Sequence, residues 1–317
     1  MAHSAISIPQ QRPATQYRDA QEQAQALAGW NQEYLQLSAG RYQGDVTEVS
    51  GKGIKLFVET VGQSIFQTGV LPDDVLAVGI PLHSTGGGMF CGRYCDASSF
   101  HVFSGASGFE FRSSRQHTML GVELRLGGLT PNSASLQASA LALPAQAHAE
   151  LKNYLLALFQ SAALQPELLS STAVVSTVAD YVLDRICAQA QSQLQSQSPS
   201  RLGDSNSTDT HWKLVQQSVT LVHEAPDMAP TVADLCSRLG VSRRTLQTAF
   251  ARVLDVSPLA YVKAARLNRA RRQLKEVASV TDAATSCGFW HFGHFARDYQ
   301  AMFGERPSET LRSVHRA

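Results

Sequence analysis

Hydrophobic positions in the first half of the chain occur in short runs typical of β-strands. Within residues 51–126, runs rich in apolar and β-branched side chains begin at Ile54, Val75, Phe100 and Met119, and Gly- and Ser-rich turns separate them. The pattern predicts a small, mostly antiparallel sheet or barrel.

Helical spacing replaces this pattern between Pro144 and Ala190. The apolar positions are Leu151, Tyr154, Leu155 and Phe159, followed by Val178, Tyr181, Val182 and Ile186. One face of each helix must therefore be covered. A sheet of the same chain and a second subunit of a homodimer are equally consistent with the spacing.

A polar stretch divides the chain into two parts. Residues 191–209 are rich in Ser, Gln, Asn and Asp and contain few apolar side chains, which predicts a flexible linker. With 317 residues, 44% of them hydrophobic, the chain is long enough for a domain on each side, at 1–190 and 210–317. The expected fold class is α+β, with a β-rich, barrel- or cupin-like first domain that also contains helices and an all-α second domain.

The second domain contains an internal repeat with a period of 48 or 49 residues. A hydroxyl side chain with a carboxylate three residues later, close to a capping box, occurs at Thr231 and again at Ser279. A glycine able to end each helix follows at Gly240 and Gly288. The apolar faces of the helices that come next repeat as well, as Leu246, Phe250 and Leu254 and then as Phe295, Tyr299 and Phe303. We therefore predict two helix-turn-helix units, at about 231–251 and 279–303.

A basic helix is predicted to join the two units, from Pro258 to Glu276. Its cationic side chains are Lys263, Arg266, Arg269, Arg271, Arg272 and Lys275. A rigid connector of this kind can hold two recognition helices about 34 Å apart, one turn of DNA, so that both enter the major groove on one face of the duplex.

The net charge of +1 conceals an asymmetry between the two parts. Residues 210–317 contain 15 Lys and Arg against 9 Asp and Glu, whereas residues 1–209 contain 12 against 17. The basic second part is therefore the one expected to bind a polyanion, namely double-stranded promoter DNA.

The second unit reads GFWHFGHFARDYQAMFGERP over residues 288–307 and resembles the signature of the AraC/XylS family of bacterial regulators. Residues 234–250, together with 30–81, which include WNQEY at 30–34 and GIP at 79–81, are similar to the ethanolamine-operon regulator branch of that family. The resemblance implies an effector-sensing first domain, transcription activation through RNA polymerase, and control of the catabolism of an amine or amino alcohol.

Candidate DNA contacts follow from the faces that the predicted cores leave free. In the first unit they are Arg243, Arg244, Gln247 and Thr248; in the second they are His291, Phe292, His294 and Arg297, with Arg266 and Arg269 on the connecting helix. Arginine suits guanine and glutamine suits adenine, but a phosphate contact is an equal alternative for each. Because the second set is less polar and includes Gly293, the first unit is expected to supply most of the specificity and the second to rely on backbone contacts and DNA shape.

Two other functions remain open from the residues alone. His83, His101, His117 and Glu123 lie in the strand region, so an enzyme-like, metal-binding first domain fused to a DNA reader is an alternative, although no His-x-His pair is present. An architectural DNA-binding protein without an effector is the other. We expect no catalytic residues, cofactor or metal.

The five cysteines are scattered, which favours reduced thiols, and only Cys91 and Cys95 are close enough to suggest a metal or redox pair. The first thirty residues lack a basic segment followed by an apolar one, and no stretch approaches about eighteen uninterrupted apolar residues, so a cytoplasmic location is expected.

Overall fold

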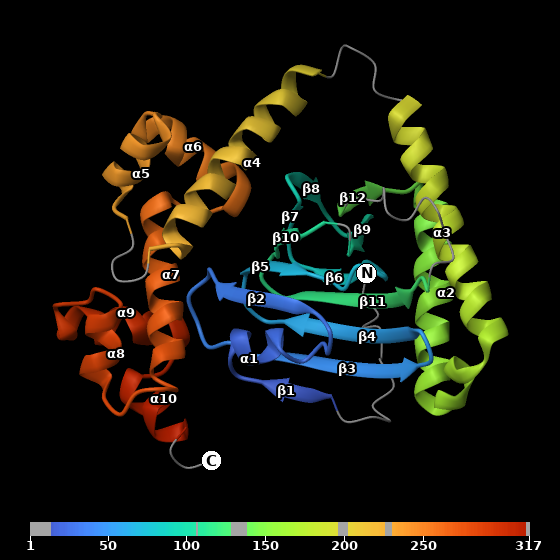
Figure 1. Cartoon of the computed structure of the whole chain (residues 1–317), viewed down its shortest axis with the longest axis horizontal. Coiled ribbons are helices and arrows are strands. Elements are labelled where there is room, and N and C mark those ends of the chain that lie inside the picture. Colours follow the sequence, from blue (N-terminus) through green and yellow to red (C-terminus); the bar gives the residue numbers. More distant parts are fainter. Residues whose placement is uncertain (1–13, 106, 128–137, 196–201, 226–229, 315–317) are drawn as a thin grey trace, which may run out of the picture.

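Two antiparallel β-sheets form the N-terminal part of the protein, and helices cover the outer face of each (Figure 1). The computed structural model describes residues 14–105, 107–127, 138–195, 202–225 and 230–314. The architecture confirms the expected fold class, with a β-rich part built from two sheets followed by a helical part that carries both helix-turn-helix units.

The larger sheet has seven strands in the order β1-β3-β4-β11-β6-β9-β12. They are β1 (Thr15–Tyr17), β3 (Gly44–Gly51), β4 (Ile54–Val61), β11 (His117–Arg125), β6 (Val75–Ser84), β9 (Ser99–Ser104) and β12 (Ser139–Ala142). The four strands predicted from sequence are β4, β6, β9 and β11. They were visible as apolar runs because both of their faces are largely buried.

The smaller sheet has five strands in the order β2-β5-β10-β7-β8. They are β2 (Asn31–Gln36), β5 (Ile65–Val70), β10 (Phe109–Arg112), β7 (Gly88–Phe90) and β8 (Arg93–Cys95), and the short helix α1 (Ala20–Ala24) precedes the first of them. These strands mix polar and apolar residues, and most of them are short, so their sequence signal is weak.

Aromatic side chains fill the space between the sheets. Phe57 and Phe103 from the larger sheet share one core with Phe90, Phe109 and Phe111 from the smaller one. Some of these rings meet edge to face, as Phe103 and Phe109 do, with centroids 4.9 Å apart, and others are stacked or tilted. The sheets therefore form a sandwich whose interior is rich in aromatic side chains.

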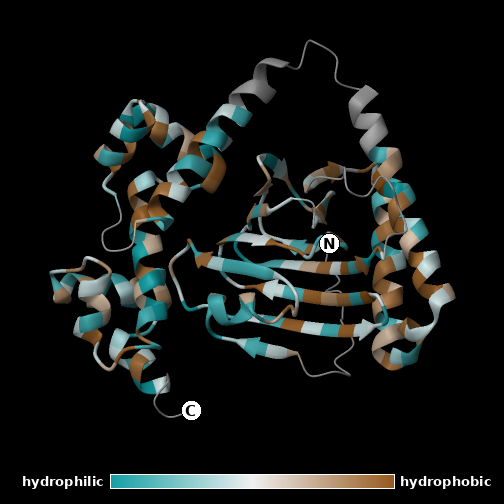
Figure 2. Ribbon diagram, viewed as in Figure 1, coloured by the Kyte–Doolittle hydropathy of each residue, from teal (hydrophilic) through white to brown (hydrophobic). Residues whose placement is uncertain are grey.

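Helices α2 (Ala145–Leu164) and α3 (Thr172–Gln195), joined by the 3-10 turn η2 (Pro166–Ser170), cover the outer face of the seven-stranded sheet. Their predicted apolar stripes, including Leu155 and Val182, lie in one core with strand residues such as Leu56 and Val122. Figure 2 shows the hydrophobic residues along these strands and helices. The helical spacing left open whether a sheet of the same chain or a second subunit covers these apolar stripes. In the structure, the sheet of the same chain covers them.

Within the residues that the structure describes, the C-terminal part contains seven helices. They are α4 (Leu202–His223), α5 (Val232–Leu239), α6 (Arg243–Leu254), α7 (Pro258–Gln273), α8 (Val280–Ser286), α9 (Phe292–Phe303) and α10 (Pro307–Val314). Among the described residues, no helix is long and apolar enough to cross a membrane.

The predicted flexible linker is wrong at both of its ends. Helix α3 runs on to Gln195 and α4 begins at Leu202, so 191–195 and 202–209 are helical, while 196–201 lie outside the described residues. The polar composition did not predict these helical ends, because a helix that is held by packing elsewhere along its length can extend into polar residues. Each residue added to the helix gains a backbone hydrogen bond. For α4 the anchors include Trp212 and Val215.

The C-terminal helices cover the outer face of the five-stranded sheet. Leu35, Phe66 and Met89 of that sheet lie in one core with α4 and with Tyr261 of α7. The rings of Phe66 and Tyr261 meet edge to face with centroids 6.4 Å apart. The layers therefore run from α2 and α3, through the two sheets, to the helix-turn-helix region.

Two buried histidines, His101 and His117, lie between the sheets with ring nitrogens that lack hydrogen-bond partners among the described residues. Within the described part of the chain, both ring nitrogens of His101 and Nε2 of His117 lack a hydrogen-bond partner. The His101 ring stacks on the Phe90 ring with centroids 4.8 Å apart. Burial lowers the pKa of His101 to about 3 and that of His117 to about 4, each with a further lowering from a neighbouring histidine. Both rings are therefore neutral at physiological pH.

Because these two histidines are buried in their neutral form, we expect the folded protein to lose stability in acid. Below about pH 6.5 both rings become protonated in the unfolded chain but stay neutral in the folded chain. The free energy of unfolding therefore decreases as the pH is lowered, until the folded pKa values are reached. Glu59 acts in the opposite sense, because burial raises its pKa to about 7 and the folded chain keeps a proton there.

The substitution His101→Phe isolates the histidine effect. In urea unfolding measured at pH 7 and pH 5, the wild type should lose about 2 kcal/mol more than the variant between the two pH values. Equal losses in the two proteins would contradict the assignment of a neutral, buried His101.

Candidate nucleic-acid interface

The first helix-turn-helix unit has the end signals expected from its sequence. Thr231 and Asp234 form a full capping box at the start of α5. Gly240, with φ of 65°, ends that helix, and the N–H groups of Gly240 and Val241 both donate to the carbonyl of Cys236. Helix α6 then begins after Ser242, whose hydroxyl accepts the N–H of Thr245 at 3.1 Å.

The second unit follows the same plan with a longer turn. Ser279 accepts the N–H of Asp282 at 3.0 Å, Gly288 has φ of 73°, and the N–H of Phe289 donates to the carbonyl of Ala284 at 2.9 Å. His291 stands at the N-cap of α9 but makes no side-chain cap. The first-turn N–H groups of α9 are therefore not satisfied by that side chain and can donate to a bound anion.

Helix α6 presents one polar face. Leu246, Phe250 and Val253 are buried, whereas the four predicted contacts Arg243, Arg244, Gln247 and Thr248 are all exposed. Arg243 and Arg244 lie in the first turn, where the positive end of the helix dipole adds to their charge. This face is therefore suited to a groove lined by phosphates.

Helix α9 presents a smaller and more aromatic face. His291, Phe292, His294 and Arg297 are exposed, as predicted, and Phe295, Tyr299 and Phe303 are buried. Sequence reasoning missed Trp290, which is 70% exposed beside Phe292 at 45%. A tryptophan in an aromatic run looks like core in sequence, and only the turn geometry places Trp290 outside.

The two candidates on the connecting helix have intramolecular partners. Arg266 donates to the carbonyls of Cys287 and Gly288, and its guanidinium lies 4.2 Å from the centre of the Phe289 ring. Arg269 donates to the carbonyl of Ala225 at 2.8 Å. We therefore assign both to holding the helix-turn-helix fold, and the predicted DNA contacts there are revised.

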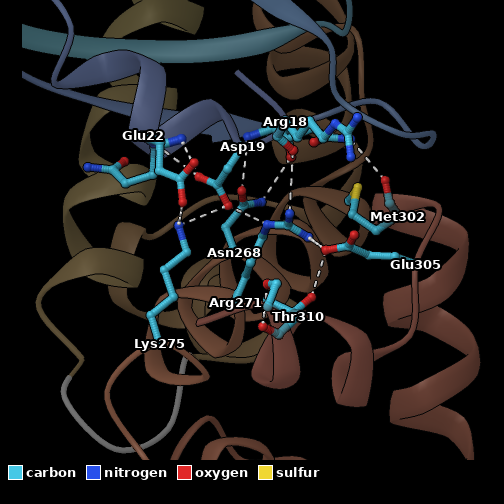
Figure 3. Close-up of polar contacts among 12 residues, drawn as sticks. Arg18, Asp19, Glu22, Asn268, Arg271, Lys275, Met302, Glu305 and Thr310 are labelled. Carbon is cyan, nitrogen blue, oxygen red and sulfur yellow. Dashed lines mark hydrogen bonds and ion pairs between the residues drawn. The ribbon is translucent and has the colours of Figure 1, made fainter. Parts of the chain in front are cut away.

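Two cationic side chains at the end of the connector, Arg271 and Lys275, face the N-terminal part. Figure 3 shows Arg271 and Lys275 converging on Asp19, with Lys275 also paired to Glu22 at 2.8 Å and Arg271 to Glu305 at 2.9 Å. Burial of Asp19 favours its neutral form, but Arg271 and Lys275 outweigh this and hold its pKa below the ordinary value. The connector is thus an ion-paired interface rather than a free basic surface.

Hydrogen bonds to main-chain atoms fix how the two parts meet. Asn268 of α7 exchanges two hydrogen bonds with the backbone of Gln36, of 3.0 and 3.1 Å. The Gln36 side chain donates to the carbonyl of Met302 near the end of α9 at 2.9 Å, and Arg112 of β10 donates to the carbonyl of Val253 in the last turn of α6 at 3.1 Å. Each recognition helix is therefore held at its C-terminal end by the N-terminal part.

The histidines, Glu123 and the cysteine pair that suggested a metal or redox site in the strand region have other surroundings in the structure. Glu123 pairs with Lys55 at 3.1 Å and accepts Trp30 Nε1 at 2.8 Å, and His83 is exposed. Across the described ranges, no three His, Cys, Asp or Glu side chains are placed to hold a metal ion. Burial raises the pKa of Cys91 to about 11 and that of Cys95 to about 12, so neither is a reactive thiolate.

Comparison with known proteins bears on the C-terminal part. Residues 235–313 match the family model described as a helix-turn-helix domain. A probable thc operon regulatory protein of Rhodococcus erythropolis is 35% identical over 105 residues, 32% of each chain, and XylDLEGF operon transcriptional activator 1 of Pseudomonas putida is 40% identical over 76 residues, 23% of each chain. The chain thus spans a third or less of the length of these relatives.

Among solved structures, a probable AraC family transcriptional regulator from Rhodopseudomonas palustris shares 40% identity over 32% of this chain and 97% of that chain, with a TM-score of 0.30. Residues 235–313 therefore contain a helix-turn-helix domain, and operon regulators are among the homologues of this part of the chain. The ethanolamine-operon branch stays a prediction.

Arg266 provides a test of the division between structural and DNA-facing arginines. Replacing it by Met removes two hydrogen bonds to main-chain carbonyls and should destabilise the second unit by about 2 kcal/mol. Hydrogen exchange over residues 279–303 should accelerate accordingly. The exposed Arg297→Met is the matched control and should leave exchange unchanged, so similar effects in both variants would contradict the assignment.

Proposed function

We propose that this chain, with its AraC-type helix-turn-helix domain, is a ligand-responsive, sequence-specific DNA-binding transcription activator. The observation that carries the proposal is the repetition of one helix pair at the two ends of α7, with the predicted contact residues of α6 and α9 exposed in both units. Two such helices joined by one rigid helix suit successive major grooves of a duplex.

The two helices would read DNA in different ways. Arg243, Arg244, Gln247 and Thr248 on α6 supply the direct contacts, with arginine on guanine or phosphate and glutamine on adenine. On α9, Arg297 and the uncapped N-terminal N–H groups favour phosphate contacts, and the exposed aromatic side chains favour thymine methyl groups.

Regulation would act through the interface between the two parts. A ligand that binds the N-terminal part changes DNA binding only if it prefers one arrangement of the parts over another. The buried pair Asp19–Arg271 and the bonds to the ends of α6 and α9 give the present arrangement its own stabilising contacts. The effector class that we propose is an amine or amino alcohol.

Further partners belong to the same proposal. In the cytoplasm the bound protein would recruit RNA polymerase, and a homodimer would occupy two neighbouring sites. Because the apolar stripes of α2 and α3 are already buried on the sheet, a dimer would use other surfaces of these helices.

Footprinting on DNA upstream of the gene and of its neighbours tests the DNA-binding function. The wild type should protect discrete sites, and Arg243→Ala/Arg244→Ala should weaken that protection by about tenfold to a hundredfold. Arg93→Ala/Arg125→Ala removes the same charge from exposed positions of the sheet part and should bind like the wild type. Diffuse protection that responds equally to both double variants would favour the architectural alternative.

A further inference from the structure

A cleft of about 690 Å³ lies between the five-stranded sheet and helix α4. Its wall on one side comes from β2, β5 and β10, and on the other side from Trp212 and Gln216 of α4. A volume of this size is in the range of sites for small organic ligands. The cleft thus joins the N-terminal part to the helix-turn-helix region.

Two glutamates lie in one row across the sheet wall. Glu33 of β2 is in register with Thr68 of β5, and Thr68 is in register with Glu110 of β10. Side chains opposite one another on neighbouring strands share a face, so both carboxylates flank Thr68. From the strand spacing, the two backbone positions are about 10 Å apart.

The charge of the cleft is negative. Glu33 and Glu110 line it, no Lys, Arg or His is among its described lining residues, and neither glutamate forms an ion pair within the described ranges. Burial raises the pKa of Glu110, and the neutral amide of Gln216, which donates to it at 3.2 Å, only partly opposes this. A cation in the cleft would stabilise both carboxylates.

The indole ring of Trp212 on α4 lines the cleft opposite the sheet. Trp212 is packed so tightly over Gly92 that a Cβ there would lie 2.9 Å from the ring, which fixes its position. Aromatic faces attract organic cations. Quaternary ammonium and guanidinium groups are weakly hydrated, so removing water from them costs little free energy. The carboxylates and the aromatic wall therefore favour the same ligand class.

We propose that this cleft binds a small organic cation, an ammonium or guanidinium compound, between the row Glu33, Thr68 and Glu110 and the indole of Trp212. Such a ligand contacts both parts of the chain and so stabilises their present arrangement. Strand β10 links the cleft to DNA recognition, because it carries Glu110 and, two residues later, the Arg112 that holds the end of α6. As an effector site, the cleft rests on the proposed function; as a cation site, it does not.

Isothermal titration calorimetry on the full chain tests the binding. The probes are ethanolamine, choline and agmatine, with ethylene glycol and acetate as uncharged and anionic controls. At least one cation should bind saturably and both controls should not. The double variant Glu33→Gln/Glu110→Gln should weaken that binding by about tenfold or more.

Two matched controls separate charge from folding. Glu167→Gln removes one carboxylate from an exposed position on η2, at the far side of the seven-stranded sheet, and should bind cations like the wild type. Thr68→Lys places a tethered ammonium between the two glutamates and should abolish binding of the free cation, whereas the uncharged Thr68→Met should retain most of it. If the double glutamine variant fails to fold, this lysine and methionine pair still decides the question.

Three results would overturn the proposal. They are saturable binding of acetate in preference to the cations, equal cation affinity in the wild type and the double variant, and no saturable binding of any cation probe at concentrations up to about 10 mM. Because calorimetry needs no DNA, a failure of cation binding leaves the footprinting result intact, and a failure of DNA binding leaves the calorimetry interpretable.

Discussion

The outer face of the five-stranded sheet is the surface on which the two parts of this chain depend. Leu35, Phe66 and Met89 would be exposed if the N-terminal part stood alone, and the C-terminal helices bury them in a shared core with Tyr261. Burying apolar area is favourable at roughly 25 cal/mol per Å², so the contact is stabilising without any specific polar bond. The helix-turn-helix region is thus packed on the two-sheet region as a layer of the same molecule.

Polar contacts then select one arrangement within that apolar contact. The buried carboxylate of Asp19 needs Arg271 and Lys275, and the backbone of Gln36 meets Asn268 in only one register. Removing one member of a buried ion pair is costly because it leaves the other charge uncompensated. An arrangement fixed in this way can be shifted by a ligand that binds beside it, as the cleft between β10 and α4 would allow.

The two helix-turn-helix units share a plan but differ in their caps and in the side chains that they expose. The first has a full capping box at Thr231 and a polar face on α6, whereas α9 begins without a side-chain cap and exposes Trp290 and Phe292. These differences fit a division in which α6 reads base edges and α9 holds the backbone and the shape of the groove. The tether from Arg266 to the second turn shows that a basic residue on the connector can be structural.

Local signals in the sequence determined the helix-turn-helix repeat, because caps such as Thr231 and Ser279, the turn glycines and the spacing of Leu246 and Phe250 act within one or two helical turns. They also determined the apolar strands of the larger sheet. The tertiary structure decided what depends on distant pairing: the helical ends of the predicted linker, the partners of Arg266 and Arg271, and the row of Glu33, Thr68 and Glu110. Residues 252 positions apart, such as Asp19 and Arg271, become neighbours only through the burial of the sheet face between them, and no local pattern records that contact.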